Sequence, residues 1–148
     1  MTTGGQRWAF AFLLATTNRD KTAELKPLLQ GLPIRLRTLA DFPGAPKVRE
    51  DGATLAANAL KKARAGARAT GLPALADDTG LFVRALGGAP GVRSARYAGH
   101  GATYADNVRK LLRELGRRPS PRPRGAVFRC AVALALPDGR AWVRAGQV

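Results

Sequence analysis

Residues 54–73, TLAANALKKARAGARATGLP, constrain the fold more than any other part of this sequence. A stripe of small apolar residues repeats every four positions, which is the spacing of one helix face: Leu55, Ala59, Ala63 and Ala67. Gly71 and Pro73 end the predicted helix, and its basic residues fall on the other sides. The short apolar run at 73–76 then predicts a strand that leads directly into Asp77 and Asp78.

Strand-like and helix-like segments alternate along the chain, and a hairpin follows them. We expect strands at residues 8–15 and from 33 onward, helices at 20–29 and 103–116, and a hairpin over 127–145 with its turn at 137–139. Asn18 or Asp20 is expected to cap the first of these helices, and Thr103 the last. This order predicts an α/β fold, with α+β as the alternative: a mixed, twisted sheet flanked by helices, with a β-hairpin near the C-terminus and an active-site cleft at the strand ends.

Length and composition limit the classes of protein to which the chain can belong. With 148 residues, 45% of them hydrophobic, residues 1–148 are expected to form a single domain with its own core. No apolar run approaches the ~18 residues of a membrane span, so we expect no membrane partner. One cysteine excludes an internal disulfide and fits a cytoplasmic location. One histidine and one cysteine are too few for a structural zinc site, so any metal would have oxygen ligands, which favours magnesium or manganese.

Residues 16–21, TTNRDK, lie where the first strand is expected to pass into the first helix. Backbone N–H groups and the positive end of the helix dipole face this position, and hydroxyl, amide and lysine side chains add further donors. Such a set of donors suits a phosphate chain, although the glycine spacing of a Walker loop is absent. An ordinary capped turn explains the same residues and stays open as the alternative.

Carboxylates in two separate segments have the chemistry to hold a hard cation. Asp77 and Asp78 are expected at the carboxyl end of a strand, where ligands of α/β sheets bind, and their side chains should point in different directions. One could bind a cation or deprotonate a water molecule, whereas a solvated turn is the simpler alternative. Glu50 precedes the helix at 54–73 and could be another metal ligand, or only an exposed acid near a helix N-terminus.

The formal charge of +15 suits a polyanionic partner, either nucleic acid or a polyphosphate. A basic nucleic-acid-binding module that uses residues 109–124 is therefore an alternative function. No aromatic residues interleave with these arginines as a stacking platform for bases would require. We therefore expect no specific nucleic-acid partner.

Several stretches, in order, resemble the motifs of the inosine triphosphate pyrophosphatase family, and the resemblance covers about 12–148. LATTNRDKTAEL, from Leu14, resembles the family's Thr-x-Asn-x-x-Lys motif. EDGATLAANALKKA, from Glu50, resembles its Glu-x-Gly-x-Thr-Phe-x-Glu-Asn-Ala-x-x-Lys-Ala segment. ADDTGLFVRALGGAPGVRSARYAG, from Ala76, matches its most characteristic segment almost residue for residue, and AVFRCAVAL follows in the expected order.

The resemblance implies hydrolysis of noncanonical purine nucleoside triphosphates (ITP, dITP and XTP) to the monophosphate and pyrophosphate, with Mg²⁺ as the cofactor and a homodimer as the assembly. It implies that Asp78 is the general base and that Asp78 and Glu50 contact the metal. Substrate contacts are implied for one run of residues and two further positions: Thr16, Thr17, Asn18, Arg19, Asp20, Lys21, Lys62 and Thr79. A carboxylate beside a cation has a lowered pKa, so we expect an ionised Asp78 and activity at neutral to alkaline pH.

The sequence departs from the family pattern in several places. Ala57 stands where the pattern has Glu, and Leu55 where it has Phe. The family's Gly-Phe-Gly-Tyr-Asp-Pro and Ser-His-Arg stretches, which help to grip the nucleotide, do not occur here. We therefore expect the domain at 1–148 to be truncated at its C-terminus, with a catalytically impaired nucleotide-binding remnant as the alternative to an active enzyme.

Overall fold

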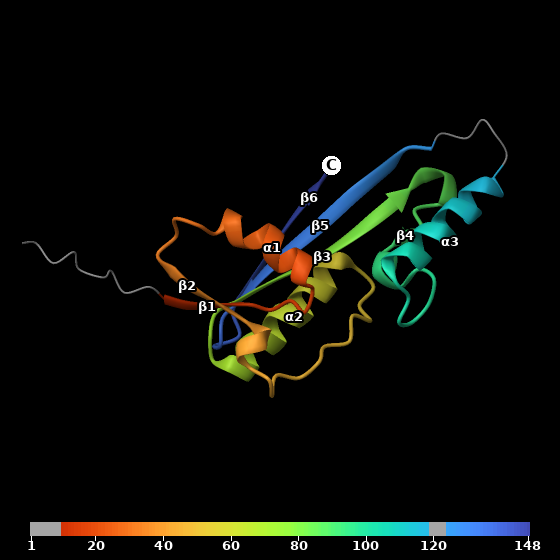
Figure 1. Cartoon of the computed structure of the whole chain (residues 1–148). Helices are drawn as coiled ribbons and strands as arrows, with labels where there is room; N and C mark the ends of the chain where they lie inside the picture. The colour runs from red at the N-terminus through yellow and green to blue at the C-terminus, as the bar shows by residue number, and fades with distance from the viewer. Residues whose placement is uncertain (1–9, 119–123) are drawn as a thin grey trace, which may run out of the picture.

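The computed structural model describes residues 10–118 and 124–148, which form a mixed sheet flanked by helices (Figure 1). The strands are β1 (Phe10–Leu14), β2 (Ile34–Thr38), β3 (Ala74–Val83), β4 (Pro90–Gly91), β5 (Ala126–Ala135) and β6 (Ala141–Gln147). The helices are α1 (Arg19–Leu28), α2 (Leu55–Thr70) and α3 (Tyr104–Gly116), with the short 3-10 helices η1 (Leu39–Asp41), η2 (Arg84–Leu86) and η3 (Ser94–Arg96).

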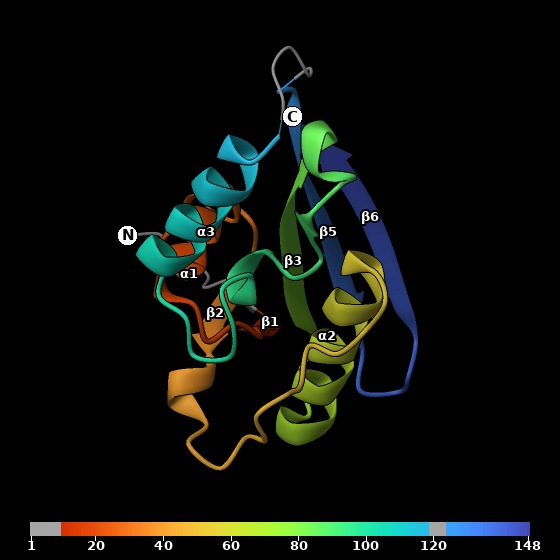
Figure 2. The same ribbon diagram turned by 90° about the vertical axis from the view of Figure 1, so that its right-hand side faces the viewer.

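The sheet combines a parallel part with a long antiparallel part. Its strand order is β2-β1-β3-β5-β6, and the short β4 pairs with β3 beside this path. β1 runs parallel to β2 and β3, whereas β5 runs antiparallel to both β3 and β6. β3 and β5 extend beyond β1 and β2 toward α3 (Figures 1 and 2). The predicted mixed sheet with a hairpin near the C-terminus is therefore confirmed.

α2 packs its stripe of small residues against the sheet and forms much of the core. Thr54 caps its first turn by accepting a hydrogen bond from the Ala57 N–H at 3.0 Å, and Gly71 ends it with a left-handed φ of 68°. The predicted stripe is buried: Leu55, Ala59, Ala63 and Ala67. Alanines of β3 and β5 lie in the same core: Ala74, Ala76, Ala131, Ala133 and Ala135. Small side chains on both surfaces let the helix and the sheet approach closely.

Gly66 marks a point of close approach between α2 and the sheet. A Cβ atom at this position would lie 2.9 Å from both Ala15 Cβ and Leu13 Cδ2. These distances are shorter than an ordinary van der Waals contact, so a larger residue requires its neighbours to move. The contact fixes α2 relative to β1, and with it the side chains that α2 presents to the cavity described below.

The other two helices begin where their sequences predict. Asn18 caps α1, because its Oδ1 accepts a hydrogen bond from the Asp20 N–H at 2.9 Å. Thr103 caps α3 and forms a capping box with Asp106. The apolar side chains of α3 are only partly covered, since none of its residues is buried and Leu112 is 62% exposed. Within the described ranges, no helix has the length and apolar character that crossing a bilayer requires.

One strand prediction is wrong, and another can be tested only in part. The strand predicted at 73–76 continues to Val83, because β5 pairs with all ten residues of β3. Asp77 and Asp78 therefore lie inside a strand rather than at its end. The sequence Asp-Asp-Thr-Gly resembles a turn locally, but the strand that pairs with it lies far along the chain. Of the strand predicted at 8–15, residues 10–14 form β1, and residues 8 and 9 lie outside the described residues.

Candidate active site

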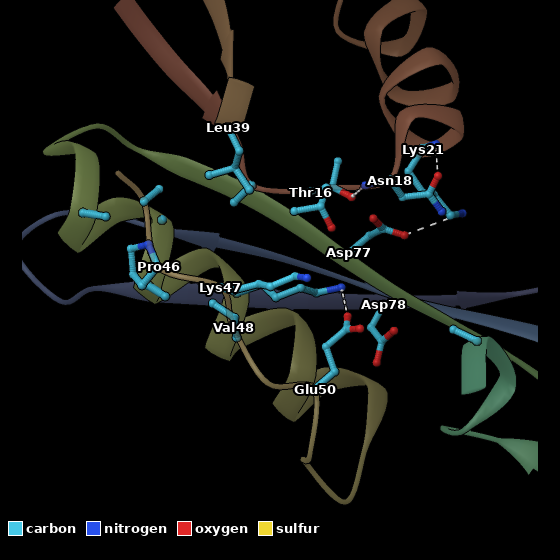
Figure 3. Close-up of a pocket in the computed structure, with 18 of the residues that line it drawn as sticks. Thr16, Asn18, Lys21, Leu39, Pro46, Lys47, Val48, Glu50, Asp77 and Asp78 are labelled. Carbon is cyan, nitrogen blue, oxygen red and sulfur yellow. Dashed lines mark hydrogen bonds and ion pairs between the residues drawn. The ribbon is translucent and has the colours of Figure 1, made fainter. Parts of the chain in front are cut away.

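A gap along one edge of β3 opens into a cavity. β1 pairs with this edge as far as Leu75 and β4 pairs with it at Leu81 and Phe82, so no strand of the described chain covers residues 76–80 there. The cavity has a volume of about 290 Å³ and reaches α1, α2 and the loop that precedes α2 (Figure 3). Ligands of open α/β sheets bind beyond the carboxyl ends of parallel strands. Here that position is set by the end of β1 rather than by the end of β3.

Most of the residues predicted to form the site line this cavity: Thr16, Thr17, Asn18, Lys21, Glu50, Lys62, Asp78 and Thr79. Arg19 and Asp20 do not line it; both are exposed in the first turn of α1. The structure therefore brings the donors suited to phosphate and the carboxylates suited to a cation into one place, although the sequence carries them in separate segments.

The loop between β1 and α1 is held by its own side chains. Thr16 Oγ1 accepts a hydrogen bond from the Asn18 N–H at 3.1 Å, and Asn18 Oδ1 accepts from the N–H groups of Asp20 at 2.9 Å and Lys21 at 3.4 Å. The cap thus occupies backbone amides that the sequence analysis assigned to a phosphate chain. Side chains of this loop face the cavity instead (Figure 3), and the dipole of α1 still favours negative charge at this end.

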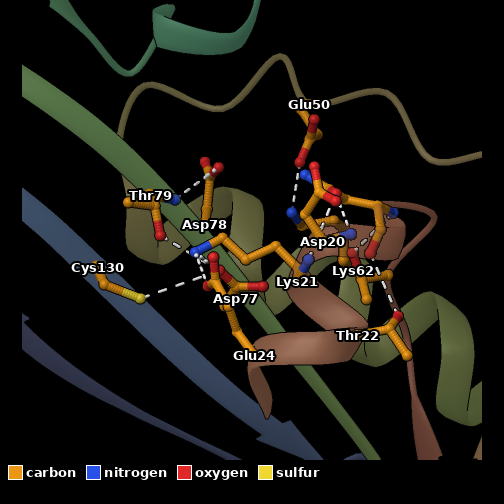
Figure 4. A network of polar contacts seen from close by, with 12 residues as sticks. Asp20, Lys21, Thr22, Glu24, Glu50, Lys62, Asp77, Asp78, Thr79 and Cys130 are labelled. Carbon is orange, nitrogen blue, oxygen red and sulfur yellow. Dashed lines mark hydrogen bonds and ion pairs between the residues drawn. The ribbon is translucent and has the colours of Figure 1, made fainter. Parts of the chain in front are cut away.

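Asp77 lies on the α1 side of β3 and is almost fully buried, with 4% of its surface exposed. Its Oδ2 lies 3.6 Å from Lys21 Nζ, accepts a hydrogen bond from Thr79 Oγ1 at 3.2 Å, and lies 4.0 Å from Cys130 Sγ (Figure 4). Burial lowers the pKa of Lys21, but Glu24 at 3.1 Å and the carboxylate of Asp77 outweigh it, so the pKa is raised. Lys21 is therefore a stable cation held beside the cavity.

Asp78 points to the opposite side of the sheet, toward α2, because successive side chains of a strand alternate. Its Oδ2 accepts a hydrogen bond from Asn58 Nδ2 at 2.9 Å, and its Oδ1 accepts from the Thr79 N–H at 3.1 Å. Burial raises the pKa of Asp78; the Asn58 hydrogen bond and Lys62 oppose this rise, and Glu50 adds to it. The net effect of the protein's own groups is a raised pKa, which is opposite in direction to the lowering expected from a neighbouring cation.

Glu50 and Lys62 form an ion pair near Asp78 that joins the loop before α2 to the helix itself (Figure 4). Lys47 lines the same cavity, and the sequence analysis gave it no role. Its segment, PGAPKVRE, has no periodicity, so nothing in the sequence distinguishes Lys47 from the many solvated lysines and arginines of the chain. Only the path of the loop brings it to the cavity.

The charged residues that line the described cavity balance in number. Three are lysines and three are carboxylates: Lys21, Lys47, Lys62, Glu50, Asp77 and Asp78. A polyphosphate would meet carboxylate repulsion there unless a cation offset it. Glu50 and Asp78 fit Mg²⁺, which uses one or two protein carboxylates together with substrate oxygens. No three His, Cys, Asp or Glu side chains in residues 10–118 and 124–148 form a closed metal site, so these two carboxylates would depend on substrate oxygens to complete the shell.

A second, more apolar cavity of about 350 Å³ adjoins the first. The two share Thr79 and Ala95, and aromatic side chains of Tyr97, Tyr104 and Phe128 line the second one. A ligand that joins an anionic part to an aromatic part would therefore find a charged surface and an apolar surface next to each other.

The basic segment 109–124 offers less free charge than its composition indicates. Residues 119–123 lie outside the described residues. In α3, Arg109 pairs with Asp106, and Arg117 pairs with Glu114 at 3.1 Å. The expectation that the chain has no specific nucleic-acid partner stays a prediction.

The sequence and the fold of this chain resemble those of known proteins. The model of the Ham1 family matches residues 12–148. The chain belongs to the Ham1 family. The resemblance based on the motifs is thereby confirmed. A protein of Geobacter sulfurreducens named dITP/XTP pyrophosphatase is 50% identical over 136 residues, which are 92% of this chain and 68% of that protein. One of the same name from Desulfotalea psychrophila is 47% identical over 135 residues, which are 91% of this chain and 59% of that protein.

Solved structures of Ham1 proteins share the fold. A HAM1 protein from Coxiella burnetii superposes with a TM-score of 0.83 at 40% identity. The match covers 93% of this chain and 70% of the Coxiella protein. A structure from Mycobacterium abscessus, described as a nucleoside-triphosphatase and dITP/XTP pyrophosphatase, has a TM-score of 0.77 at 43% identity. The match covers 93% of this chain and 72% of that protein. The chain therefore spans between 59% and 72% of the length of these four relatives.

Proposed function

We propose that the chain is a Mg²⁺-dependent nucleoside triphosphate pyrophosphatase that hydrolyses ITP, dITP and XTP to the monophosphate and pyrophosphate, and so removes these noncanonical purines from the nucleotide pool. One observation carries the proposal: Asn18 and Lys21, suited to a triphosphate, line the same cavity as Glu50 and Asp78, suited to a cation. The printed names of the Ham1 relatives support the substrate class. The adjoining aromatic cavity supports a ligand that carries a base.

The triphosphate is bound by side chains at the start of α1 and by the lysines around it. Thr16 and Asn18 present a hydroxyl and an amide to the cavity, and Lys21 presents a cation. Asp77 holds Lys21 at 3.6 Å, so the lysine meets the phosphates in a fixed position. Lys21 and Lys62 stabilise the charge that develops on the leaving pyrophosphate, which is a larger effect in a partly enclosed cavity than in water.

Asp78 is placed to accept a proton from the attacking water. The water oxygen bonds to the α-phosphorus, and the bond from that phosphorus to the oxygen bridging to the β-phosphorus breaks. The products are the nucleoside monophosphate and pyrophosphate, and the proton that the water loses passes to Asp78. A general base must be ionised to accept a proton. Burial raises the pKa of Asp78 in the metal-free protein, and a cation held by Asp78 and Glu50 would lower it. Activity should fall as the pH decreases far enough to protonate Asp78.

Glu50 and Asp78 would hold the metal, together with phosphate oxygens of the substrate. When bound, Mg²⁺ offsets phosphate charge and orients the group under attack. The ion pair with Lys62 keeps the Glu50 carboxylate at the cavity before any ligand arrives.

The product distribution tests this proposal. Incubation of the 148-residue chain with dITP and Mg²⁺ should release dIMP and pyrophosphate in equal amounts, whereas dGTP should react more slowly. Asp78→Asn should reduce the rate by about 10²–10⁴-fold, the usual contribution of a general base. Release of dIDP and inorganic phosphate, or full activity of Asp78→Asn, would contradict the assignment.

The same experiment separates an active enzyme from a catalytically impaired remnant. Calorimetry would detect dITP binding whether or not turnover follows. Binding that requires Lys21 but gives no products would support the remnant, whereas turnover that EDTA abolishes would support the enzyme.

We extend the proposal to a homodimer, as the resemblance implies, and to a cytoplasmic location, which the single cysteine fits. Large apolar side chains are exposed on α3, β5 and β6, which supports contact with another subunit: Tyr104, Leu112, Phe128 and Trp142. Sedimentation equilibrium should give twice the mass of the 15.7 kDa chain. A monomer at all concentrations would contradict this part of the proposal.

A further inference from the structure

Asn58 is the residue of α2 that lies deepest beside the candidate metal ligands. It is fully buried, with 0% of its surface exposed, which is unusual for an amide side chain. Its two polar atoms are both used: Nδ2 donates to Asp78 Oδ2 at 2.9 Å, and Oδ1 accepts from the Gly52 N–H at 2.7 Å. Asn58 belongs to the segment that resembles the family motif, but no role follows for it from the sequence.

These two hydrogen bonds join the two segments that carry the carboxylates. Gly52 lies two residues after Glu50 in the loop before α2, and Asp78 belongs to β3. A single amide group therefore ties the Glu50 loop to the Asp78 strand. The orientation of the amide is fixed chemically, because the reverse orientation would place Oδ1 against a carboxylate and Nδ2 against an N–H group.

The surroundings of Asn58 make this connection rigid. Asn58 precedes the buried Ala59 on α2, and Gly66 presses the same helix against the sheet, so the amide cannot shift independently of β3. On the loop side, a Cβ at Gly52 would lie 2.6 Å from Asn58 Oδ1 and 3.0 Å from Ala57 Cβ. The loop backbone thus lies directly against the amide, with no room for a side chain between them.

We propose that Asn58 is a positioning residue that sets the separation of the Glu50 and Asp78 carboxylates for a divalent cation. The inference rests on the proposed function, since it assigns the cation to these two residues. Asn58 is buried and does not line the cavity, so it acts through the groups that it holds rather than through contact with substrate. Groups that hold metal ligands in place usually contribute about 10–100-fold to metal affinity.

Two variants remove the connection from its two sides. Asn58→Leu fills a similar volume but makes neither hydrogen bond. Gly52→Ala leaves Asn58 and the core of α2 intact and pushes the loop away from the amide; its φ is not left-handed, so alanine is strained there only by the contact. Asn107→Ala is the matched control, because Asn107 also bridges a loop with both amide atoms, accepting from the Ala98 N–H at 2.8 Å and donating to Ala95 O at 3.0 Å.

Mn²⁺ binding, followed by electron paramagnetic resonance on the 148-residue chain, is the primary measurement. Asn58→Leu and Gly52→Ala should weaken Mn²⁺ binding by about 10–100-fold, and Asn107→Ala should leave it unchanged even where it lowers thermal stability. Amide exchange at Gly52, measured by NMR, should accelerate in Asn58→Leu. Gly52→Ala serves alone if Asn58→Leu does not fold.

The outcomes separate this inference from the proposed function. Suppose that Asp78→Asn weakens Mn²⁺ binding, but Asn58→Leu and Gly52→Ala bind Mn²⁺ as tightly as the unmodified chain. This result would overturn the role of Asn58 only. Equal binding by the wild type and Asp78→Asn would overturn the metal site of the proposed function itself. In that case, slow exchange at Gly52 in Asn58→Leu would also show that Asn58 does not hold the loop.

Discussion

Gly66→Ala measures how closely α2 must approach the sheet for the site to form. The added Cβ would lie 2.9 Å from Ala15 Cβ and from Leu13 Cδ2, and 3.5 Å from Ala74 Cβ. All three neighbours are buried, so they cannot move into solvent. Overpacking of this kind costs about 1–3 kcal/mol, whereas alanine in place of a helical glycine gains about 1 kcal/mol. We expect a net loss in the free energy of unfolding of about 1 kcal/mol.

Gly116→Ala, at the end of α3, provides the control. No atom lies within 4 Å of a Cβ built at Gly116, so this variant gains helix propensity without overpacking. The difference between the two variants therefore isolates the packing cost, about 2 kcal/mol, which corresponds to a separation of about 4–8 °C between their thermal midpoints.

Differential scanning calorimetry of the two variants and the wild type gives the answer directly. Gly66→Ala should unfold below the wild type, and Gly116→Ala at or above it. Equal midpoints for the two variants would refute the close packing of α2. The placement of Lys62 at the cavity, and of Asn58 against Asp78, would then lose its structural basis.

Three further predictions concern charged residues of the cavity. Lys47→Ala should raise the KM for dITP by about tenfold, the loss of one charge-assisted hydrogen bond, with kcat and stability unchanged; Arg49→Ala, which does not alter the cavity lining, is the control, and equal KM values would remove Lys47 from the substrate contacts. Asp77→Asn should lower the free energy of unfolding by about 1–3 kcal/mol in urea titrations and raise the KM, because a buried carboxylate no longer holds Lys21. A variant with both values unchanged would contradict the ion pair. In EDTA, Asp78→Asn should be more stable than the wild type at about pH 8, and the difference should fade toward about pH 4. The reason is that folding raises the pKa of the Asp78 carboxyl. Such a carboxyl stabilises the folded state below its folded pKa and loses this contribution as the pH rises through it. If Asp78→Asn is less stable than the wild type at about pH 8, the raised pKa of Asp78 is contradicted.

Elements that depend on neighbouring residues could be predicted from the sequence. The caps at Asn18 and Thr103 act within one helical turn, and the stripe on α2 follows from its spacing alone. The hairpin at the C-terminus is similarly local. The ordered motifs also brought the phosphate-type donors and the two carboxylates into one predicted site, and these residues share one cavity in the structure.

The rest depends on contacts between distant segments. The length of β3 is set by its pairing with β5, so the turn-like Asp-Asp-Thr-Gly sequence gave the wrong end for the strand. Lys47 reaches the cavity through an irregular loop, and the role of Asn58 depends on a loop and a strand that meet only in the folded chain. The resemblance also implies substrate contacts for Arg19 and Asp20, but both are exposed in the first turn of α1 and do not line the cavity.

A crystal structure of the chain with Mn²⁺ and a non-hydrolysable dITP analogue tests the central claim most directly. The anomalous difference map should show one strong peak at coordination distance from both Glu50 and Asp78, and the triphosphate should contact Asn18 and Lys21. A manganese peak elsewhere, or a triphosphate bound away from β3, would contradict the account.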